Sequence, residues 1–161
     1  MICDLAAEFV TPTTTNPTVA NMAALARDLG AAVLVRRSQS SGFRTQAALT
    51  DASRIRRLIQ LETGRFANLT ANEVASLAKI PIVIVVGDHC STSQPPSTCT
   101  IELQQVKAAG GDVTFIALPS PGLIGNSHMF MQDKNNRRSQ TSARMGSAGT
   151  LIARNVIAER D

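Results

Sequence analysis

The sequence contains no tryptophan, no tyrosine and only five phenylalanines. Proteins that bind single-stranded nucleic acid commonly interleave basic residues with aromatic side chains on which the bases stack. The net charge is +4 and 13 of the 16 basic residues are arginine, but the arginines occur mostly as scattered pairs without such aromatic neighbours. We therefore interpret the positive charge as solvated surface charge and expect no nucleic-acid partner.

Long apolar segments and clustered cysteines are also missing. The longest charge-free apolar stretch, residues 80–87, is far shorter than the roughly 20 residues that span a bilayer, so we expect no membrane-spanning helix. Asp4 and Glu8 occupy the region where a secretory signal carries basic residues, so no signal peptide is expected on this chain. The three cysteines lack the spacing of zinc ligands, so we expect no metal site. The sequence allows a disulfide between Cys90 and Cys99 but does not require one.

The composition that remains is that of one globular domain. The chain has 161 residues, of which 43% are hydrophobic and 17% are charged. This is too apolar and too weakly charged for a disordered chain, and the length allows one buried core.

Strand-like and helix-like patterns alternate along the chain. Four segments read as strands: residues 31–35, 55–61, 80–86 and 113–118. Five read as helices: residues 17–29, 45–49, 71–79, 100–109 and 128–136. The third strand is a continuous β-branched run, which is typical of a parallel strand covered on both faces. The alternation predicts an α/β fold with a mostly parallel sheet of about four strands flanked by helices.

Local signals mark several of the expected helix ends. Asn16 is a suitable N-cap and Pro17 suits the first turn of the helix that follows, while Gly30 is a suitable stop. Thr70 and Glu73 have the spacing of a capping box at the start of a later helix.

The candidate chemistry lies just after the expected strands, because ligands of parallel α/β sheets bind outside the carboxyl ends of the strands. Ser38 follows the first strand, Glu62 the second and Asp88 the third, and His128 lies in the loop after the fourth. A hydroxyl, a carboxylate and an imidazole are the groups that an activated serine nucleophile requires. The order serine, acid, histidine is that of the α/β-hydrolases.

Each of these residues also has an ordinary structural interpretation. Ser38 lies in a serine-rich segment, SQSSG, that is typical of a polar turn, and Asp88 in GDH is a suitable turn or cap residue. Glu62 could be a surface carboxylate and His128 a loop histidine. The residues alone therefore leave the catalytic and the structural interpretations both open.

Four segments together resemble the C-terminal half of an α/β-hydrolase: VLVRRSQSSGF, LIQLETG, IPIVIVVGDH and GNSHMFMQDKNN. The resemblance is strongest to bacterial and fungal carboxylesterases whose nucleophile elbow reads S-H-S-Q followed by small residues. GNSHMFMQDKNN is the most specific segment, because that subgroup places its catalytic histidine in a G-N-[ST]-H context. The resemblance extends from about Thr11 to Asn136.

The resemblance implies a role for each candidate residue. Ser38 would be the nucleophile, His128 the general base and Glu62, in LETG, the orienting acid, with Asp88 as the runner-up acid. The backbone N–H of Gln39 would donate to the oxyanion. The implied activity is hydrolysis of a small-molecule carboxylic ester through an acyl-enzyme, with no cofactor and no metal.

Two features depart from the family pattern. Arg36 and Arg37 precede Ser38, and Arg37 stands where the subgroup has histidine and is expected to crowd the elbow. The family's earlier strands are not present on this chain, so the nucleophile strand is expected to be an exposed sheet edge through which the protein self-associates. These departures support an alternative: a catalytically inactive, truncated hydrolase remnant that acts as a binding or oligomerising module.

The residues after Asn136 differ in character from those before. The segment RRSQTSARMGSAGT is rich in serine, arginine and glycine, and only the last residues look helical again. We therefore divide the chain into a partial α/β-hydrolase domain, residues 1–136, and a divergent tail with a weak terminal helix, residues 137–161.

Overall fold

The computed structural model describes residues 16–38, 41–63, 69–88, 103–120 and 122–137. In chain order the elements are α2 (Pro17–Asp28), β1 (Ala32–Ser38), α3 (Ser41–Thr50), the 3-10 helix η1 (Ala52–Arg54), β2 (Ile55–Thr63), α4 (Ala71–Leu77), β3 (Ile82–Val86), β4 (Val113–Ala117) and the 3-10 helix η2 (Phe130–Gln132). Residues 103–108 are also helical. Within these ranges, no helix combines the length and the apolar character that a bilayer crossing requires.

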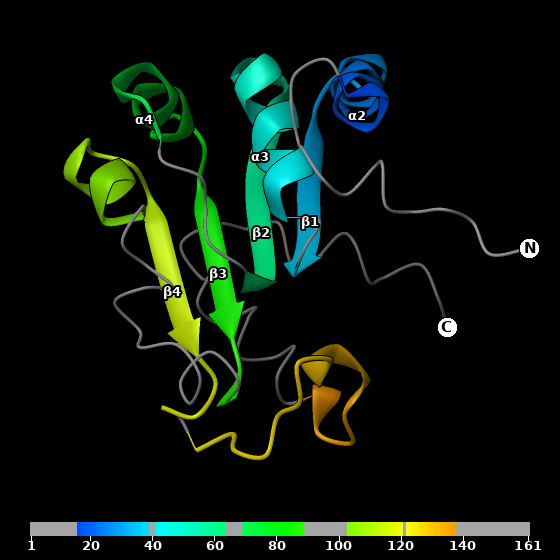
Figure 1. The fold of residues 1–161 in the computed structure, drawn as a ribbon, viewed down its shortest axis with the longest axis vertical. Helices are drawn as coiled ribbons and strands as arrows, with labels where there is room; N and C mark the ends of the chain where they lie inside the picture. Colours follow the sequence, from blue (N-terminus) through cyan, green and yellow to red (C-terminus); the bar gives the residue numbers. More distant parts are fainter. Residues whose placement is uncertain (1–15, 39–40, 64–68, 89–102, 121, 138–161) are drawn as a thin grey trace, which may run out of the picture.

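The four strands form one parallel sheet in the order β1-β2-β3-β4 (Figure 1). The expected α/β fold, a four-stranded parallel sheet flanked by helices, is confirmed. Strand order follows chain order, and crossovers between parallel strands share one hand, so the intervening helices fall on the same face of the sheet. Among the described residues, those that follow β4 pack on the other face.

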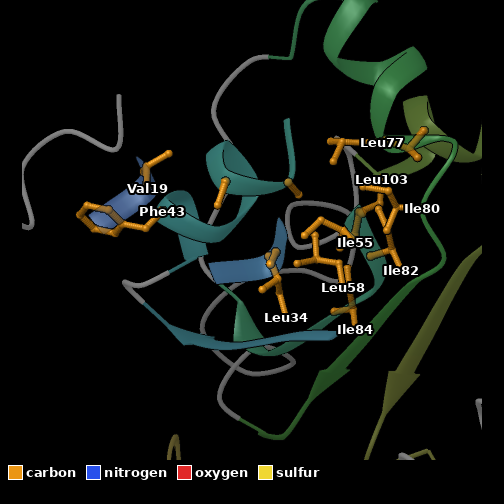
Figure 2. Packing of buried hydrophobic residues seen from close by; sticks show 14 of the residues in the cluster. Val19, Leu34, Phe43, Ile55, Leu58, Leu77, Ile80, Ile82, Ile84 and Leu103 are labelled. Atoms are coloured by element: carbon orange, nitrogen blue, oxygen red, sulfur yellow. The ribbon is translucent and has the colours of Figure 1, made fainter. Parts of the chain in front are cut away.

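The larger hydrophobic core lies between the sheet and its helices. Leu34 of β1, Leu58 of β2 and Ile84 of β3 gather there from neighbouring strands (Figure 2). Phe43 of α3 and Leu77 of α4 are buried in the same cluster. Each large apolar side chain removed from water contributes about 1.5–3 kcal/mol, so this cluster holds the helices on the sheet.

A smaller core covers the opposite face of the sheet. Val83 and Val85 of β3 pack there with Leu118, Leu123 and Phe130, which all follow β4 in the chain. Successive residues of a strand point to opposite faces, and all five residues of β3 are buried, as its apolar sequence predicts. The smaller core therefore fastens the segment after β4, which carries the candidate histidine, to the sheet.

The local helix signals are confirmed. The side chain of Asn16 accepts a hydrogen bond from the backbone N–H of Thr18 at 2.9 Å, with Pro17 as the first residue of α2. Thr70 and Glu73 form the expected capping box: Thr70 Oγ1 accepts from the backbone N–H of Glu73 at 3.3 Å, and Glu73 Oε2 accepts from the backbone N–H of Thr70 at 2.7 Å.

Two local expectations are wrong. The polar turn expected to begin at Ser38 is not observed there, because β1 continues through Ser38, which pairs with Thr63 of β2. Over residues 128–136 the structure shows the three residues of η2, and helix only again at 136. Asp133 in this segment accepts hydrogen bonds from the backbone N–H and the hydroxyl of Ser127, both at 2.7 Å, a pairing that a continuous helix from residue 128 would not allow.

The capping box of α4 gives a test of this local structure. Thr70→Ala removes the hydroxyl that accepts from Glu73, so we expect the free energy of unfolding to fall by about 1 kcal/mol, measured by urea denaturation. Thr70→Ser keeps the hydroxyl and should lose less than half as much. An alanine variant as stable as the unsubstituted protein would contradict the assignment.

Candidate active site

The residues expected to carry chemistry gather at the carboxyl edge of the sheet. β1 ends at Ser38, β2 ends one residue after Glu62, and Asp88 lies two residues beyond the end of β3. The chain after β4, drawn in yellow and orange in Figure 1, lies beyond the arrowheads of the strands and includes His128. Parallel strands bring these positions to the same edge, where α/β folds bind their ligands.

Glu62 occupies a β-bulge in β2. Arg37 of β1 pairs with Leu61 and Ser38 pairs with Thr63, so Glu62 is the extra residue between the two pairs. Its φ of 48° is the only positive φ of a non-glycine residue in the part of the chain that the structure describes. A non-glycine residue in this region costs about 1–3 kcal/mol, and bulges beside active sites redirect a side chain. The surrounding contacts must therefore stabilise this conformation.

Both oxygens of the Glu62 carboxylate have partners. Oε1 accepts a hydrogen bond from the backbone N–H of Gly87. Oε2 lies 3.2 Å from Nδ1 of His128. The Glu62 side chain is only 1% exposed, whereas the His128 side chain is 37% exposed. A buried carboxylate is stable only when hydrogen-bonded or paired, and these contacts satisfy that requirement while leaving part of the imidazole accessible.

Gly87 leaves room for this carboxylate. A Cβ atom at position 87 would lie 2.8 Å from Glu62 Oε1 and 3.0 Å from Cβ of Asn126. Both separations are shorter than carbon atoms in folded proteins normally tolerate, so any larger residue would displace Glu62 or the loop that contains Asn126. The glycine is thus required by space at the end of β3.

The loop in front of the histidine is anchored by side-chain carboxylates. Asp88 Oδ2 accepts from the backbone N–H of Asn126, which connects the loop to the end of β3. Asp133 accepts from the backbone N–H and the hydroxyl of Ser127. The buried Asn126 side chain in turn accepts from Nδ2 of Asn135 at 3.1 Å. These contacts hold the backbone at residues 126 and 127, directly before His128.

Arg37 contacts the same loop from β1. Its Nε and Nη2 atoms donate to the backbone carbonyl oxygen of His128, at 3.3 and 3.2 Å. Arg37, expected to crowd the elbow, thus makes a specific contact with the residue that bears the imidazole, while residues 39–40 of the elbow lie outside the described residues.

The structure thus brings Glu62 and His128 together and directs Asp88 to Asn126 instead. The backbone of Ser38 lies at the end of β1, while its side chain falls outside what the structure describes. Gln39, Cys90 and Cys99 also lie outside the described residues.

Sequence reasoning missed the contributions of several residues around this pair. Nothing in the pattern indicated that Gly87 makes room for a carboxylate, because Glu62 lies 25 residues away in the chain. Nor did it indicate that Asp133 anchors the histidine loop, because that contact with Ser127 requires the segment between them not to be helical. The one feature of the sequence that could have drawn attention to Gly87 is its position directly after the buried strand β3. Among the described residues, no three histidine, cysteine, aspartate or glutamate side chains form a group that could hold a metal ion.

Comparisons with known proteins agree with this architecture, although no protein-family model matches the chain. A solved structure described as "The Atomic Resolution Structure of a Novel Bacterial Esterase" superposes with a TM-score of 0.72 and 34% sequence identity, covering 84% of this chain. A protein named "Probable secreted lipase phiG", from Fungal sp. (strain ATCC 74256), is 43% identical over 61 residues, which are 38% of this chain.

The chain spans only part of each of these proteins: 43% of the bacterial esterase chain and 16% of the fungal lipase are covered. On this similarity of sequence and fold, the chain belongs to the esterase/lipase-like α/β-hydrolases, of whose fold it spans a part.

Proposed function

We propose that this chain carries the catalytic serine, acid and histidine of a carboxylic-ester hydrolase. Ser38 is the nucleophile, His128 the general base and Glu62 the acid that orients the imidazole. The observation that carries the proposal is the contact of 3.2 Å between Glu62 Oε2 and His128 Nδ1 at the carboxyl edge of the sheet, where β1 also ends. The substrate class is a small-molecule ester, by analogy with the esterase and lipase relatives.

In the proposed reaction, Ser38 Oγ forms a bond to the ester carbonyl carbon and its proton moves to Nε2 of His128. The tetrahedral intermediate then expels the alcohol, which takes the proton from His128, and leaves an acyl group on Ser38. Water attacks the acyl-enzyme in the same way and releases the carboxylic acid and the free serine. Glu62 accepts the Nδ1–H of His128 throughout, which keeps Nε2 free to take the proton.

Glu62 is better suited than Asp88 to this role. Its Oε1 is held by the backbone N–H of Gly87 while Oε2 faces His128, so the carboxylate orientation is determined on both sides. Asp88 accepts from the backbone of Asn126 and holds the loop instead. In this proposal the backbone N–H of Gln39, the residue after the nucleophile, donates to the oxyanion of the intermediate.

The alternative is an inactive module that associates with a partner or with itself. One observation favours it: β1 is an outer strand of the described sheet, and its Val35 is 46% exposed. Within the described sheet, β1 has a strand neighbour on one side only, and an edge strand can pair with another chain. Ester turnover that depends on Ser38 separates the two proposals, because an inactive module has none.

Ser38→Ala should abolish labelling of the protein by a fluorophosphonate probe and reduce hydrolysis of a short-chain p-nitrophenyl ester by more than about 1,000-fold. The matched control is Ser53→Ala, an exposed serine that donates to Asp51 before β2 begins, which should retain full labelling. Labelling that survives Ser38→Ala would contradict the assignment of the nucleophile.

Glu62→Gln should lower kcat by about 100- to 10,000-fold with KM within about threefold. Glutamine has one acceptor oxygen, and we expect the backbone N–H of Gly87 to donate to it, as it does to Glu62 Oε1. Its NH2 group then faces Nδ1 of His128 and favours the tautomer with a protonated Nε2, which cannot accept a proton.

Asp88→Asn is the comparison variant for this test. Its amide oxygen can still accept from the backbone of Asn126, so we expect less than about a tenfold loss in kcat. A larger loss for Asp88→Asn than for Glu62→Gln, measured under the same steady-state conditions, would reverse the assignment of the acid.

Gly87→Ala should lower the free energy of unfolding by about 1–3 kcal/mol, as expected for overpacking, and reduce ester turnover by more than about tenfold, because the new methyl group displaces the Glu62 carboxylate. Gly111→Ala is the control: its Cβ would lie 2.8 Å from both Cγ1 and the backbone oxygen of Val106, a clash with backbone that lies before β4 and away from Glu62. It should be destabilised at least as much in thermal melts yet keep its turnover. Equal loss of turnover in both variants would refute the specific role of Gly87.

A further inference from the structure

Arg37 connects the strand that carries the proposed nucleophile with the loop that carries the proposed base. We propose that Arg37 is a positioning residue that holds His128 in place relative to Ser38. The inference rests on the proposed function and deepens it: it assigns a role to one of the two arginines that depart from the S-H-S-Q pattern.

The contact uses two donors on a single acceptor. Nε and Nη2 of Arg37 both donate to the carbonyl oxygen of His128, at 3.3 and 3.2 Å. The donors of a guanidinium group have a rigid relative geometry, and hydrogen bonds from a cation are about twice as strong as neutral ones. The contact therefore restrains the direction as well as the distance of the His128 backbone.

His128 is restrained from two different strands. Glu62 of β2 contacts its ring at Nδ1, and Arg37 of β1 contacts its backbone carbonyl. The anchors at Asn126 and Ser127 tie the loop to Asp88 after β3 and to Asp133 within the same loop. Arg37 connects His128 to β1, the strand whose next residue is Ser38.

The contact between Arg37 and His128 bears on proton transfer from Ser38 to His128. The general base must lie within hydrogen-bond reach of the nucleophile, and a misplacement of about 1 Å can cost roughly 100-fold in rate. Arg37 and Ser38 are consecutive residues at the end of one strand, and both are paired with β2. A contact from Arg37 to His128 therefore limits movement of the imidazole relative to the nucleophile.

The test compares Arg37→Met, which keeps an apolar stem but removes both donors, with Arg37→Lys, which keeps the charge and one donor group. Arg56→Ala is the control, because Arg56 is an exposed arginine on β2 outside the proposed site. We expect Arg37→Met to reduce kcat and the rate of fluorophosphonate labelling by about 10- to 100-fold, with KM within about threefold. Arg37→Lys should fall between Arg37→Met and the unsubstituted protein, and Arg56→Ala should not differ from the latter.

A second readout does not depend on catalysis. The sequence has two histidines, so a His89→Gln background leaves His128 as the only source of imidazole NMR signals. The Nδ1–H proton that is shared with Glu62 should give a protected downfield resonance in this background. Arg37→Met should broaden or shift that resonance, and Arg56→Ala should leave it unchanged.

An Arg37→Met protein with unchanged kcat and an unchanged His128 resonance would overturn the proposal. If that variant does not fold, Arg37→Lys decides in the same way, because it must show a reduced kcat or an altered resonance. If the unsubstituted protein neither hydrolyses esters nor reacts with the probe, the esterase proposal fails by itself. The resonance comparison then still decides whether Arg37 positions His128.

Discussion

The buried carboxylate of Glu62 makes demands that shape the whole carboxyl edge of the sheet. A charged group removed from water needs hydrogen-bond partners for both of its oxygens, and here they come from β3 and from the loop after β4. The β2 bulge and the positive φ of Glu62 place the carboxylate between those partners. Only glycine fits at position 87 without displacing neighbours, because the Glu62 carboxylate occupies the space that a Cβ atom would need.

The loop with His128 is held by contacts of two kinds. Apolar side chains on either side of it, Leu123 and Phe130, are buried against β3 in the smaller core. Hydrogen bonds to Asp88, Asp133 and Arg37 then determine the course of its backbone. Apolar burial supplies non-directional stability, whereas hydrogen bonds depend strongly on angle. Together they hold a histidine that belongs to no helix or strand close to a carboxylate on β2.

Much of the fold could be predicted from the sequence because its signals are local. The β-branched run of β3, the capping box at Thr70 and the N-cap at Asn16 each depend on residues within a few positions of one another. The failed expectations involve specific hydrogen bonds that helix and turn propensities do not describe. Asp133 binds Ser127 beside the segment expected to be a helix, and Ser38, expected in a turn, pairs with Thr63 of the neighbouring strand.

For the candidate site, the sequence by itself determined which residue types stand at the strand ends, since strand patterns and the residues that follow them can be read directly. It left two carboxylates as candidates for the partner of His128, and only its resemblance to a family favoured Glu62. The tertiary structure alone decided that Glu62 meets the imidazole, across 66 residues of chain, while Asp88 binds the loop backbone. It also gave Arg37 a partner 91 residues away. The physical reason is that hydrogen bonds form between groups a few ångströms apart, and only the folded sheet sets those distances.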